Sequence, residues 1–338
     1  MEVKIVSYDE LSAICVGKFI KAGISNEHAK TTTDVLLHAN LRGVDSHGVL
    51  RMEHYIQKIL HGGIQANPTI TIKDTGPVTA IVDGDDGLGH VIVEQAMKHA
   101  IDLAKKNGVG MVSAINSSHC GALSYFVKMA AEHGMIGIAM TNTDKMVVPF
   151  GGSAAFFGTN PLAFGFPAGI NPPIILDMAT SSVAYGKILE ALQSGKSIPP
   201  EWGVDQAGQS ITDPQQFAAL LPFGGAKGYG LGMVVDIFAG ILTGSPYGPH
   251  VGQMHGGDYS EKRKLGHFVC AINVSKFTAS GSFLSNMDQM IDELHAVPPA
   301  AGFSQVMVPG EPECRKEAER QHTGIPIPVE LYHYLTNS

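Results

Sequence analysis

The fold is decided by one stretch, residues 90–143, which reads HVIVEQAMKHAIDLAKKNGVGMVSAINSSHCGALSYFVKMAAEHGMIGIAMTNT. Apolar side chains recur at helical spacing over 90–108 and 122–134. Residues 109–115 and 135–143 have instead the short apolar runs that are typical of strands. Because strands and helices alternate along this stretch, the sequence predicts an α/β fold.

Further elements are predicted on both sides of this stretch. The predicted strands are residues 69–74, 78–84, 174–182 and 267–275. The predicted helices are residues 226–244, which have a glycine-rich start, and residues 283–297. Between them, residues 147–167 are rich in glycine, proline and aromatic residues and are expected to form loops and short strands.

Both ends of the chain are expected to be helical. Ser7 and Glu10 have the spacing of a capping box before a helix that runs to about residue 22, and Ser25 and Gly43 bound a second helix. A third helix is predicted from Ser46 to residues 61–63, and the tail at about 311–335 returns to helix. We therefore expect residues 1–65 and 311–338 to form a helical part that supplies dimer contacts and packs on an α/β body of residues 66–310, which would bind cofactor and substrate.

The composition excludes several classes of protein. The chain has 338 residues, of which 44% are hydrophobic and 16% charged, and it contains 40 glycines, as in a globular protein. Its net charge is −8 and no block of Lys or Arg stands out, so nucleic acid and acidic membranes are poor candidates as partners. The longest apolar runs, such as residues 231–242, are too short to span a bilayer.

Neither secretion nor a metal centre is expected. The first residues lack the basic start and apolar core of a signal peptide. The four cysteines lie far apart and form no zinc-binding pattern, which favours a reduced, cytoplasmic protein. His47, His54 and His61 recur every seven residues, but that length of helix rises about 10.5 Å. Metal ligands lie about 2 Å from one ion, so these histidines are not expected to share one.

A first candidate for chemistry is the segment RGVDSHGVLRMEHY, residues 42–55. If a helix starts near Ser46, His47 and Arg51 share one of its faces. A guanidinium can hold a carboxylate by two parallel hydrogen bonds, and the imidazole can bond to or exchange a proton with the neighbouring oxygen. The pair therefore suits a 2-hydroxy or 2-keto acid, although an exposed helix face without a function explains the same residues.

A second candidate is the corner at His119 and Cys120, where a predicted strand meets a predicted helix. Ligands of α/β sheets bind at the carboxyl ends of strands, which favours a functional His119, and the alternative is a turn histidine bonded to its own loop. Cys120 suggests a Cys–His nucleophile. However, neighbours in sequence rarely point at one another, so a small buried cysteine is the better interpretation.

Two further segments suit a nucleotide, although G-x-G-x-x-G and the P-loop pattern are both absent. GGAKGYGLG at 224–232 places Lys227 and backbone N–H groups at a helix start, which is suited to a pyrophosphate. LDMATSS at 176–182 has Asp177 and hydroxyl side chains at a strand end, which suits a ribose or a phosphate. The alternative is that its hydroxyls only cap a helix.

These segments together resemble the malate/L-lactate dehydrogenase type 2 family over nearly the whole chain. The resemblance rests on the motifs SHG…R (46–51), SHCGALSYF (118–126), VVPFGG…GTNPLAF (147–164), DMATSSVAYGKI (177–188) and KGYGL (227–231). It implies a non-Rossmann α/β fold with a mixed sheet flanked by helices, a nicotinamide cofactor (NAD, with NADP as the alternative), a small 2-hydroxyacid substrate and a homodimer with sites near the interface.

The resemblance also implies roles for individual residues. His119 would be the acid/base and His47 a second polar group on the substrate oxygen, with the two roles open to exchange. Ser46, Arg51 and Asn160 would contact the substrate. The residues that would line the cofactor are Thr143, Asp177, Met178, Ala179, Lys227, Gly228, Pro309, Gly310 and Glu311.

Within the family, four stretches narrow the resemblance to members that oxidise (S)-ureidoglycolate to oxalurate in allantoin catabolism. They are MVVPFGG (146–152), IPPEWGVD (198–205), LLPFGGAKGYGL (220–231) and AGFSQVMVPGE (301–311). The alternatives are another 2-hydroxy or 2-keto acid, such as malate, lactate, sulfolactate or diketogulonate, or a cyclic imino acid. Outside this class, a Cys120 amidohydrolase and a ligand-binding protein without turnover stay open.

Overall fold

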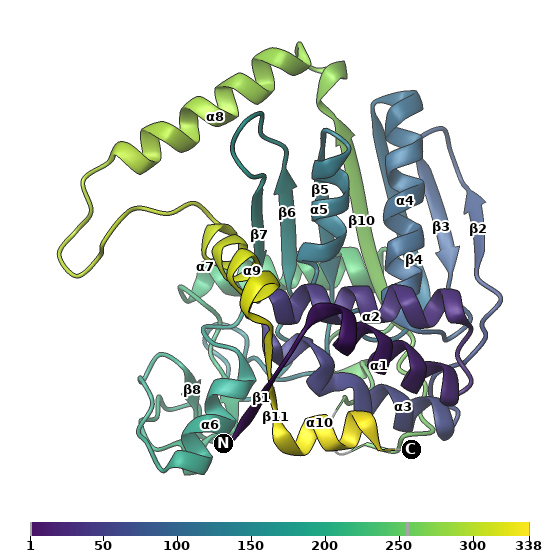
Figure 1. The fold of residues 1–338 in the computed structure, drawn as a ribbon. Coiled ribbons are helices and arrows are strands. Elements are labelled where there is room, and N and C mark those ends of the chain that lie inside the picture. The colour runs from purple at the N-terminus through teal and green to yellow at the C-terminus, as the bar shows by residue number, and fades with distance from the viewer. Residues whose placement is uncertain (1, 255–256, 338) are drawn as a thin grey trace.

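A mixed sheet of seven strands forms the centre of the molecule (Figure 1). The computed structural model describes residues 2–254 and 257–337. In order across the sheet, the strands are β2 (Thr71–Asp74), β3 (Thr79–Asp83), β4 (Val109–Ser117), β10 (Leu265–Asn273), β5 (Met135–Thr141), β6 (Leu162–Phe166) and β7 (Ile174–Met178). All of the strands predicted from the sequence are therefore found, and β6 falls in the segment that was expected to hold loops and short strands.

The strand directions bring several loops to one edge of this sheet. β10 is antiparallel to both β4 and β5, β3 is parallel to β4, and β6 is antiparallel to both β5 and β7. It follows that β3, β4, β5 and β7 all point the same way. Their carboxyl ends meet at one edge, where β10 also begins, and this is the edge at which α/β sheets bind ligands.

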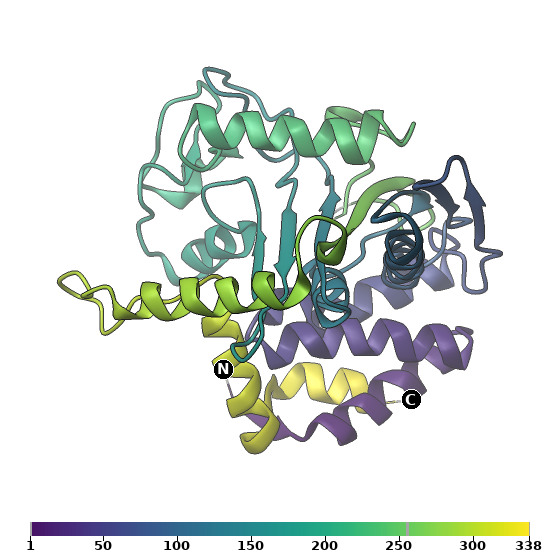
Figure 2. The ribbon, with the colours of Figure 1, turned by 90° about the horizontal axis from the view of Figure 1, so that it is seen from above.

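Helices cover both faces of the sheet, as Figure 2 shows from above. On one face lie α4 (Gly89–Asn107) and α5 (Ser124–Glu132), and on the other lies α7 (Ala226–Asp236), continued by the π-helical turn η4 (Ile237–Ile241). α5 packs very closely on β5 and β6, because a Cβ at Gly137 would lie 2.9 Å from the Val127 carbonyl oxygen and one at Gly165 would collide with it. Glycine at these positions thus determines how near α5 lies to the sheet.

The two ends of the chain pack together beneath the sheet edge (Figure 1). A buried apolar cluster joins α1 (Tyr8–Lys21), α2 (Asn26–Leu41), α3 (Met52–Leu60) and α10 (Val329–Thr336). Both predicted caps are confirmed: Ser7 accepts a hydrogen bond from the Glu10 N–H and Ser25 accepts one from the His28 N–H. The sequence interpretation missed β1 (Val3–Val6), which pairs with β11 (Ile325–Pro328), because a single short strand has no local signal for a partner so distant in the chain.

Two predicted helices differ from the structure. Instead of one helix from Ser46, the chain makes two 3₁₀ turns, η1 (Asp45–His47) and η2 (Val49–Arg51), before α3 begins. The break falls at Gly48, which is extended and where a Cβ would collide with the Asn40 side chain. The tail is likewise divided, because α9 (Glu311–Thr323) ends at Gly324, whose φ is 88°.

The remaining segments form a small lobe and an arm. The lobe contains α6 (Tyr185–Ser194), β8 (Gly203–Val204), η3 (Pro214–Gln216) and β9 (Ala219–Leu220), and it has its own apolar cluster. The arm is α8 (Ser280–Ala296), which follows the short turn η6 (Val274–Lys276) and projects from the body in Figure 1. η5 (Gly248–His250) lies between η4 and β10. Among the described residues, no helix is both long and apolar enough to cross a membrane.

Candidate active site

Polar side chains gather where β4, β5 and β7 end. His119 follows β4, Thr143 follows β5, and Asp177 is the last residue but one of β7. Hydrogen bonds connect these ends, since the Ser124 N–H beyond His119 donates to Asp177 Oδ2 over 2.7 Å. The structure therefore brings together residues that are up to 58 positions apart in the chain (119 to 177), as the rule for strand ends predicts.

His119 is held by a buried tyrosine on another element. The Tyr55 hydroxyl, on α3, lies 2.6 Å from His119 Nδ1, and the Gly121 N–H approaches the same nitrogen at 3.3 Å. Burial, together with the neighbouring His47, Arg51, His90 and Arg263, lowers the pKa of His119 well below its ordinary value of 6.5. At neutral pH the ring is consequently uncharged, and both hydrogen-bond contacts of the ring are at Nδ1.

His47 and Arg51 come together on the two 3₁₀ turns rather than on a helix face. Arg51 Nε donates to the Ser46 carbonyl over 2.8 Å, and Ser46 Oγ lies 3.1 Å from His47 Nδ1. The His47 and His119 rings stack with their centroids 5.8 Å apart. Burial and the charge of Arg51 lower the pKa of His47 to about 4, so this second imidazole is also neutral. An arginine thus lies beside two neutral imidazoles, a set that suits a small carboxylic acid with an adjacent oxygen.

Sequence reasoning missed three residues of this corner: Tyr55, His90 and Arg263. Tyr55 and His90 are fully buried and their rings meet edge to face, 4.9 Å between centroids. On the sequence they look like core positions of helices, and only the tertiary contact with His119 gives them another role.

Arg263 precedes β10 and is buried beside His119. Its Nη2 donates to Asp144 Oδ1 over 2.7 Å and its Nε to the Gly252 carbonyl over 2.9 Å. Its Nη1 is buried and has no hydrogen-bond partner among the described residues. Because a buried donor without a partner is costly, this nitrogen is suited to a ligand oxygen. In the sequence Arg263 was hidden in the charged run EKRK at 261–264.

The cavity at this corner is small. It is lined by His54, Tyr55, Lys58, Gly63, Ile64, Ser118, His119 and Arg263, and its volume is about 10 Å³. That space holds about one water molecule.

The residues expected to bind the cofactor divide into two groups. Lys227 is exposed in the first turn of α7, two residues after Gly225; Gly224 and Gly225 have φ of 56° and 65°. The first turn of a helix has free N–H groups and a positive dipole end, so glycines, N–H groups and a lysine together fit a pyrophosphate. Gly228 packs on the Phe223 carbonyl, where a Cβ would collide.

The second group lies beside β7. Pro309 accepts a hydrogen bond from the Ile175 N–H, and a Cβ at Gly310 would lie 2.6 Å from the Ile175 carbonyl oxygen. This places residues 309–310 against Ile175, two residues before Asp177 on β7. The Glu311 carboxylate accepts hydrogen bonds from His295, Arg315 and the Val308 N–H, so it is already engaged within the chain.

Thr143 and Asn160 are tied to the scaffold. Thr143 Oγ1 accepts a hydrogen bond from the Thr159 N–H, and the Thr143 N–H donates to Asn160 Oδ1 over 3.2 Å. Asn160 is fully buried and its Nδ2 donates to the Gly232 carbonyl of α7. Both ends of this amide hold backbone, so the Asn160 side chain is fixed between β5 and α7.

Cys120 is buried beside the corner. Burial and the nearby Asp177 raise the pKa of its thiol to about 12, so the thiol is protonated at neutral pH and is a poor nucleophile. The geometry therefore gives no support to a Cys120 hydrolase. No three potential metal ligands converge anywhere in the described ranges.

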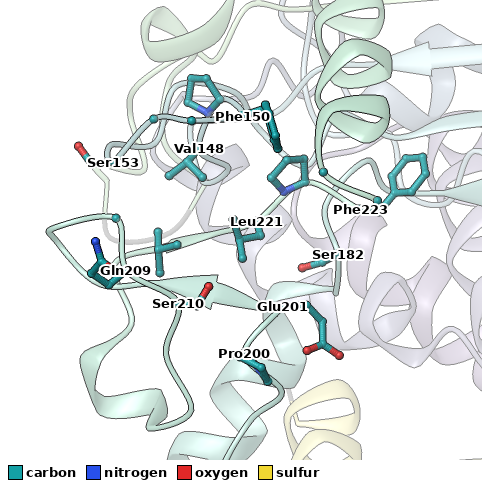
Figure 3. Close-up of a pocket in the computed structure, with 18 of the residues that line it drawn as sticks. Val148, Phe150, Ser153, Ser182, Pro200, Glu201, Gln209, Ser210, Leu221 and Phe223 are labelled. Atoms are coloured by element: carbon teal, nitrogen blue, oxygen red, sulfur yellow. The ribbon is translucent and has the colours of Figure 1, made fainter.

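A much larger cavity lies elsewhere, between the small lobe and the loops beside it (Figure 3). Its volume is about 930 Å³, and loops 148–153, 200–210 and 221–225 line most of it. Glu201 is the labelled carboxylate in Figure 3, and the other labelled polar groups are the hydroxyls of Ser153, Ser182 and Ser210 and the amide of Gln209. None of the residues expected in the site lines this cavity, although Gly224 and Gly225 border both it and the α7 start.

Fold and site define an α/β protein that lacks the Rossmann fingerprint and whose corner at His119 suits a small carboxylic acid. Comparison with known proteins gives its class. A family model described as malate/L-lactate dehydrogenase matches residues 6–336. The ureidoglycolate dehydrogenase (NAD(+)) of Escherichia coli (strain K12) is 42% identical over 330 residues, which are 98% of this chain and 94% of the relative. The malate dehydrogenase of Pyrococcus abyssi is 40% identical over 329 residues, 94% of this chain and 90% of the relative.

Solved structures show the same architecture. The sulfolactate dehydrogenase of Methanocaldococcus jannaschii superposes with a TM-score of 0.93 at 38% identity, covering 98% of this chain and 95% of that one. The chain belongs to the malate/L-lactate dehydrogenase family. The predicted fold class and the family resemblance are thus confirmed.

Proposed function

We propose that the protein is an NAD-dependent dehydrogenase of 2-hydroxyacids and that its substrate is (S)-ureidoglycolate, which it oxidises to oxalurate. The observation that carries the proposal is the neutral His119, bonded to Tyr55 and stacked on His47 beside Arg51. The name of the E. coli relative supports both the substrate and NAD. The names of relatives that act on malate and sulfolactate make these acids the alternatives.

Three side chains of this chain divide the work on the substrate. Arg51 binds the carboxylate, and His47 donates a hydrogen bond to the neighbouring oxygen. His119 takes the hydroxyl proton at Nε2, which turns the C2–OH group into C2=O as the C2 hydride leaves. NAD⁺, when bound, supplies the acceptor for that hydride. The products are then the 2-ketoacid, NADH and a protonated His119.

Tyr55 serves both forms of His119. For Nε2 to take the proton, Nδ1 must carry a hydrogen and donate it to Tyr55 Oη, so the Gly121 N–H, 3.3 Å away, then no longer bonds to this nitrogen. Tyr55 Oη continues to accept from Nδ1–H when the ring becomes imidazolium. The 2.6 Å contact orients the ring toward the substrate. The low pKa of His119 keeps the base in its active form well below pH 6.5.

For the dinucleotide, we propose that Lys227 and the α7 start hold the pyrophosphate. Thr143, Gly228, the segment Asp177–Ala179 and residues 309–310 would line the rest of its path. Glu311 would hold the shape of this segment rather than contact the dinucleotide. Its carboxylate, at the start of α9, already accepts hydrogen bonds from His295 and Arg315.

Arg263 Nη1 supports a substrate with a second polar group. This buried nitrogen beside His119 lacks a partner among the described residues, and the ureido carbonyl of ureidoglycolate would satisfy it. A second carboxylate or a sulfonate would do the same, whereas lactate has no such group. This favours ureidoglycolate, malate or sulfolactate over lactate.

The test is a panel assay of the purified protein with NAD⁺ and NADP⁺ at 340 nm. The panel contains (S)-ureidoglycolate, (S)-malate, sulfolactate, lactate and diketogulonate. We expect the highest kcat/KM for ureidoglycolate with NAD⁺. A higher value for another acid would reject the substrate but keep the class, and binding without any turnover would reject the class.

We also propose a homodimer. An exposed apolar face follows α7 and η4 and contains Leu231, Val234, Ile237, Ile241 and Leu242, each 40–58% exposed. Apolar faces of this kind are suited to burial against another subunit. The sequence expectation placed dimer contacts in the helical part of residues 1–65 and 311–338. Sedimentation of the wild-type chain and of Val234→Asp would decide, because only an α7 interface predicts that this variant is monomeric.

A further inference from the structure

We propose that α9 couples the dinucleotide segment at residues 309–311 to the substrate turn at residues 45–51, and that Arg320 is the positioning residue of this coupling. The inference rests on the proposed function, since it assigns a ligand to each end of α9. It concerns a residue outside the motifs of the site and a helix at the far end of the chain. Figure 1 shows α9 lying across the end of α2, which leads into the turn.

Arg320 is bound to the turn by a planar pair of hydrogen bonds. Its Nη1 and Nη2 donate to Asp45 Oδ1 and Oδ2 over 2.7 and 3.0 Å, and Nη1 also donates to the Asn40 carbonyl. The Arg320 side chain is 12% exposed and that of Asp45 is 46% exposed, so the guanidinium is mostly covered while water reaches the carboxylate. A guanidinium fork on a carboxylate fixes both distance and direction, which a single surface ion pair does not.

Asp45 passes this constraint into the turn. Its Oδ1 accepts from Asn40 Nδ2 over 2.7 Å, and Asn40 Oδ1 accepts from the Val49 N–H over 2.9 Å. Asn40 is buried and touches Gly48, the residue at which the two 3₁₀ turns meet. The positions of His47 and Arg51, on either side of Gly48, therefore depend on the pair formed by Arg320 and Asp45.

The other end of α9 is fastened next to the dinucleotide segment. Arg42, at the end of α2, donates to the Gly310 carbonyl over 3.2 Å and to Glu317 Oε2 over 2.9 Å. Glu317 Oε1 also accepts from Lys128 of α5. Gly310 packs on Ile175 of β7 with φ of 87°, a conformation that other residues rarely adopt. A ligand that fixes residues 309–311 consequently restrains α9, and through Arg320 it restrains the substrate turn.

This arrangement predicts a thermodynamic linkage. If NAD⁺ steadies the turn, the substrate binds more tightly to the NAD⁺ complex than to the free protein, and the reverse holds by the same factor. Loss of the Arg320 fork should weaken substrate binding while NAD⁺ binding to the free protein is retained.

The experiment compares the wild type with Arg320→Met, Asp45→Asn, the double variant and Glu319→Gln. Glu319 is the control because it lies on the same helix and pairs with Lys316 at the exposed surface. NAD⁺ affinity is measured by fluorescence titration, the turn by amide hydrogen exchange of residues 45–51 with and without NAD⁺, and catalysis by KM and kcat. Thermal unfolding shows which variants are folded.

We expect NAD⁺ to slow exchange in the turn of the wild type and of Glu319→Gln. In Arg320→Met and Asp45→Asn this slowing should disappear, and the substrate KM should rise about 10-fold with kcat and NAD⁺ affinity within about 2-fold. The double variant should be no worse than either single variant, because both remove the same interaction. Arg320→Lys, which keeps the charge and one hydrogen bond, should recover part of the KM.

Three results would overturn the proposal: no effect of NAD⁺ on exchange in the wild-type turn, additive effects in the double variant, or a fall in kcat and NAD⁺ affinity as large as the change in KM. These results differ from failure of the proposed function. A protein that binds NAD⁺ and shows the linked exchange but oxidises none of the panel acids would refute the substrate class and leave the coupling intact.

Discussion

The corner at His119 and the cavity of the small lobe differ in volume by almost two orders of magnitude, at about 10 and 930 Å³. The small one brings together His119, Tyr55, Arg263 and, behind them, His90, most of them buried. The large one has one carboxylate, Glu201, among hydroxyls, an amide and glycines. Shifted pKa values accompany the small cavity, and it is there that proton transfer can be controlled.

The difference follows from how each wall is made. Helix α3 contributes His54, Tyr55 and Lys58 to the corner, and His119 and Arg263 each lie two residues outside a central strand, β4 and β10. The helix and the two strands thus fix where these side chains lie. Loops line most of the large cavity. Rigid elements hold catalytic groups more accurately than loops do, which makes volume a poor guide to the reactive site in this protein.

The strongest test of this contrast is His119→Ala. Loss of the base should lower kcat by about 10²–10⁴-fold, because general-base catalysis contributes that much. His47→Ala should weaken catalysis less, since His47 is assigned a hydrogen bond only. Near-normal turnover of His119→Ala together with an inactive His47→Ala would exchange the two roles.

Acid sensitivity is the next test, and it uses His90, which is fully buried and whose pKa burial lowers to about 3. Below pH 6.5 the unfolded chain protonates this ring and the native protein does not, so stability falls as the pH falls toward 3. His90→Leu should remove about 1.4 kcal/mol per pH unit from the slope of the unfolding free energy between about pH 4.5 and pH 6. Urea unfolding at several pH values measures it. The exposed His322→Gln is the control, and an unchanged slope in His90→Leu would contradict the prediction.

Tyr55→Phe tests the orientation of His119 with a smaller expected effect. The variant keeps the buried ring and removes the hydroxyl that lies 2.6 Å from Nδ1. A lost hydrogen bond to a ring that becomes charged should lower kcat about 10-fold, with the substrate KM nearly unchanged. A fall in kcat that accompanies a fall in the unfolding temperature, while the pH profile of kcat stays the same, would indicate a purely structural tyrosine.

Glu201→Gln should have the smallest effect. If the large cavity is not part of catalysis, kcat and KM should stay within about 2-fold of the wild type, as for most surface substitutions. Steady-state kinetics with the best substrate of the panel measures both. A loss comparable to that of Tyr55→Phe would bring the large cavity into the active site and remove the contrast.

Much of the site could be found from the sequence because it lies at strand ends. His119 and Asp177 were assigned from a strand followed by polar residues, and Lys227 from glycines at a helix start. Tyr55, His90 and Arg263 could not be found in this way. Their functional partners are distant in sequence. In their own segments, Tyr55 and His90 resemble ordinary core residues and Arg263 resembles an ordinary surface charge.

The sequence by itself determined the alternation of strands and helices, the two serine caps and the family, because periodicity, capping and motifs are local properties of the chain. The tertiary structure alone decided that β1 pairs with β11, that the chain breaks at Gly48 against Asn40, and that His119 meets Tyr55. These contacts join segments whose approach depends on packing of the whole chain. The free energy of each contact depends on two residues that are distant in sequence, so no single stretch of the chain indicates it.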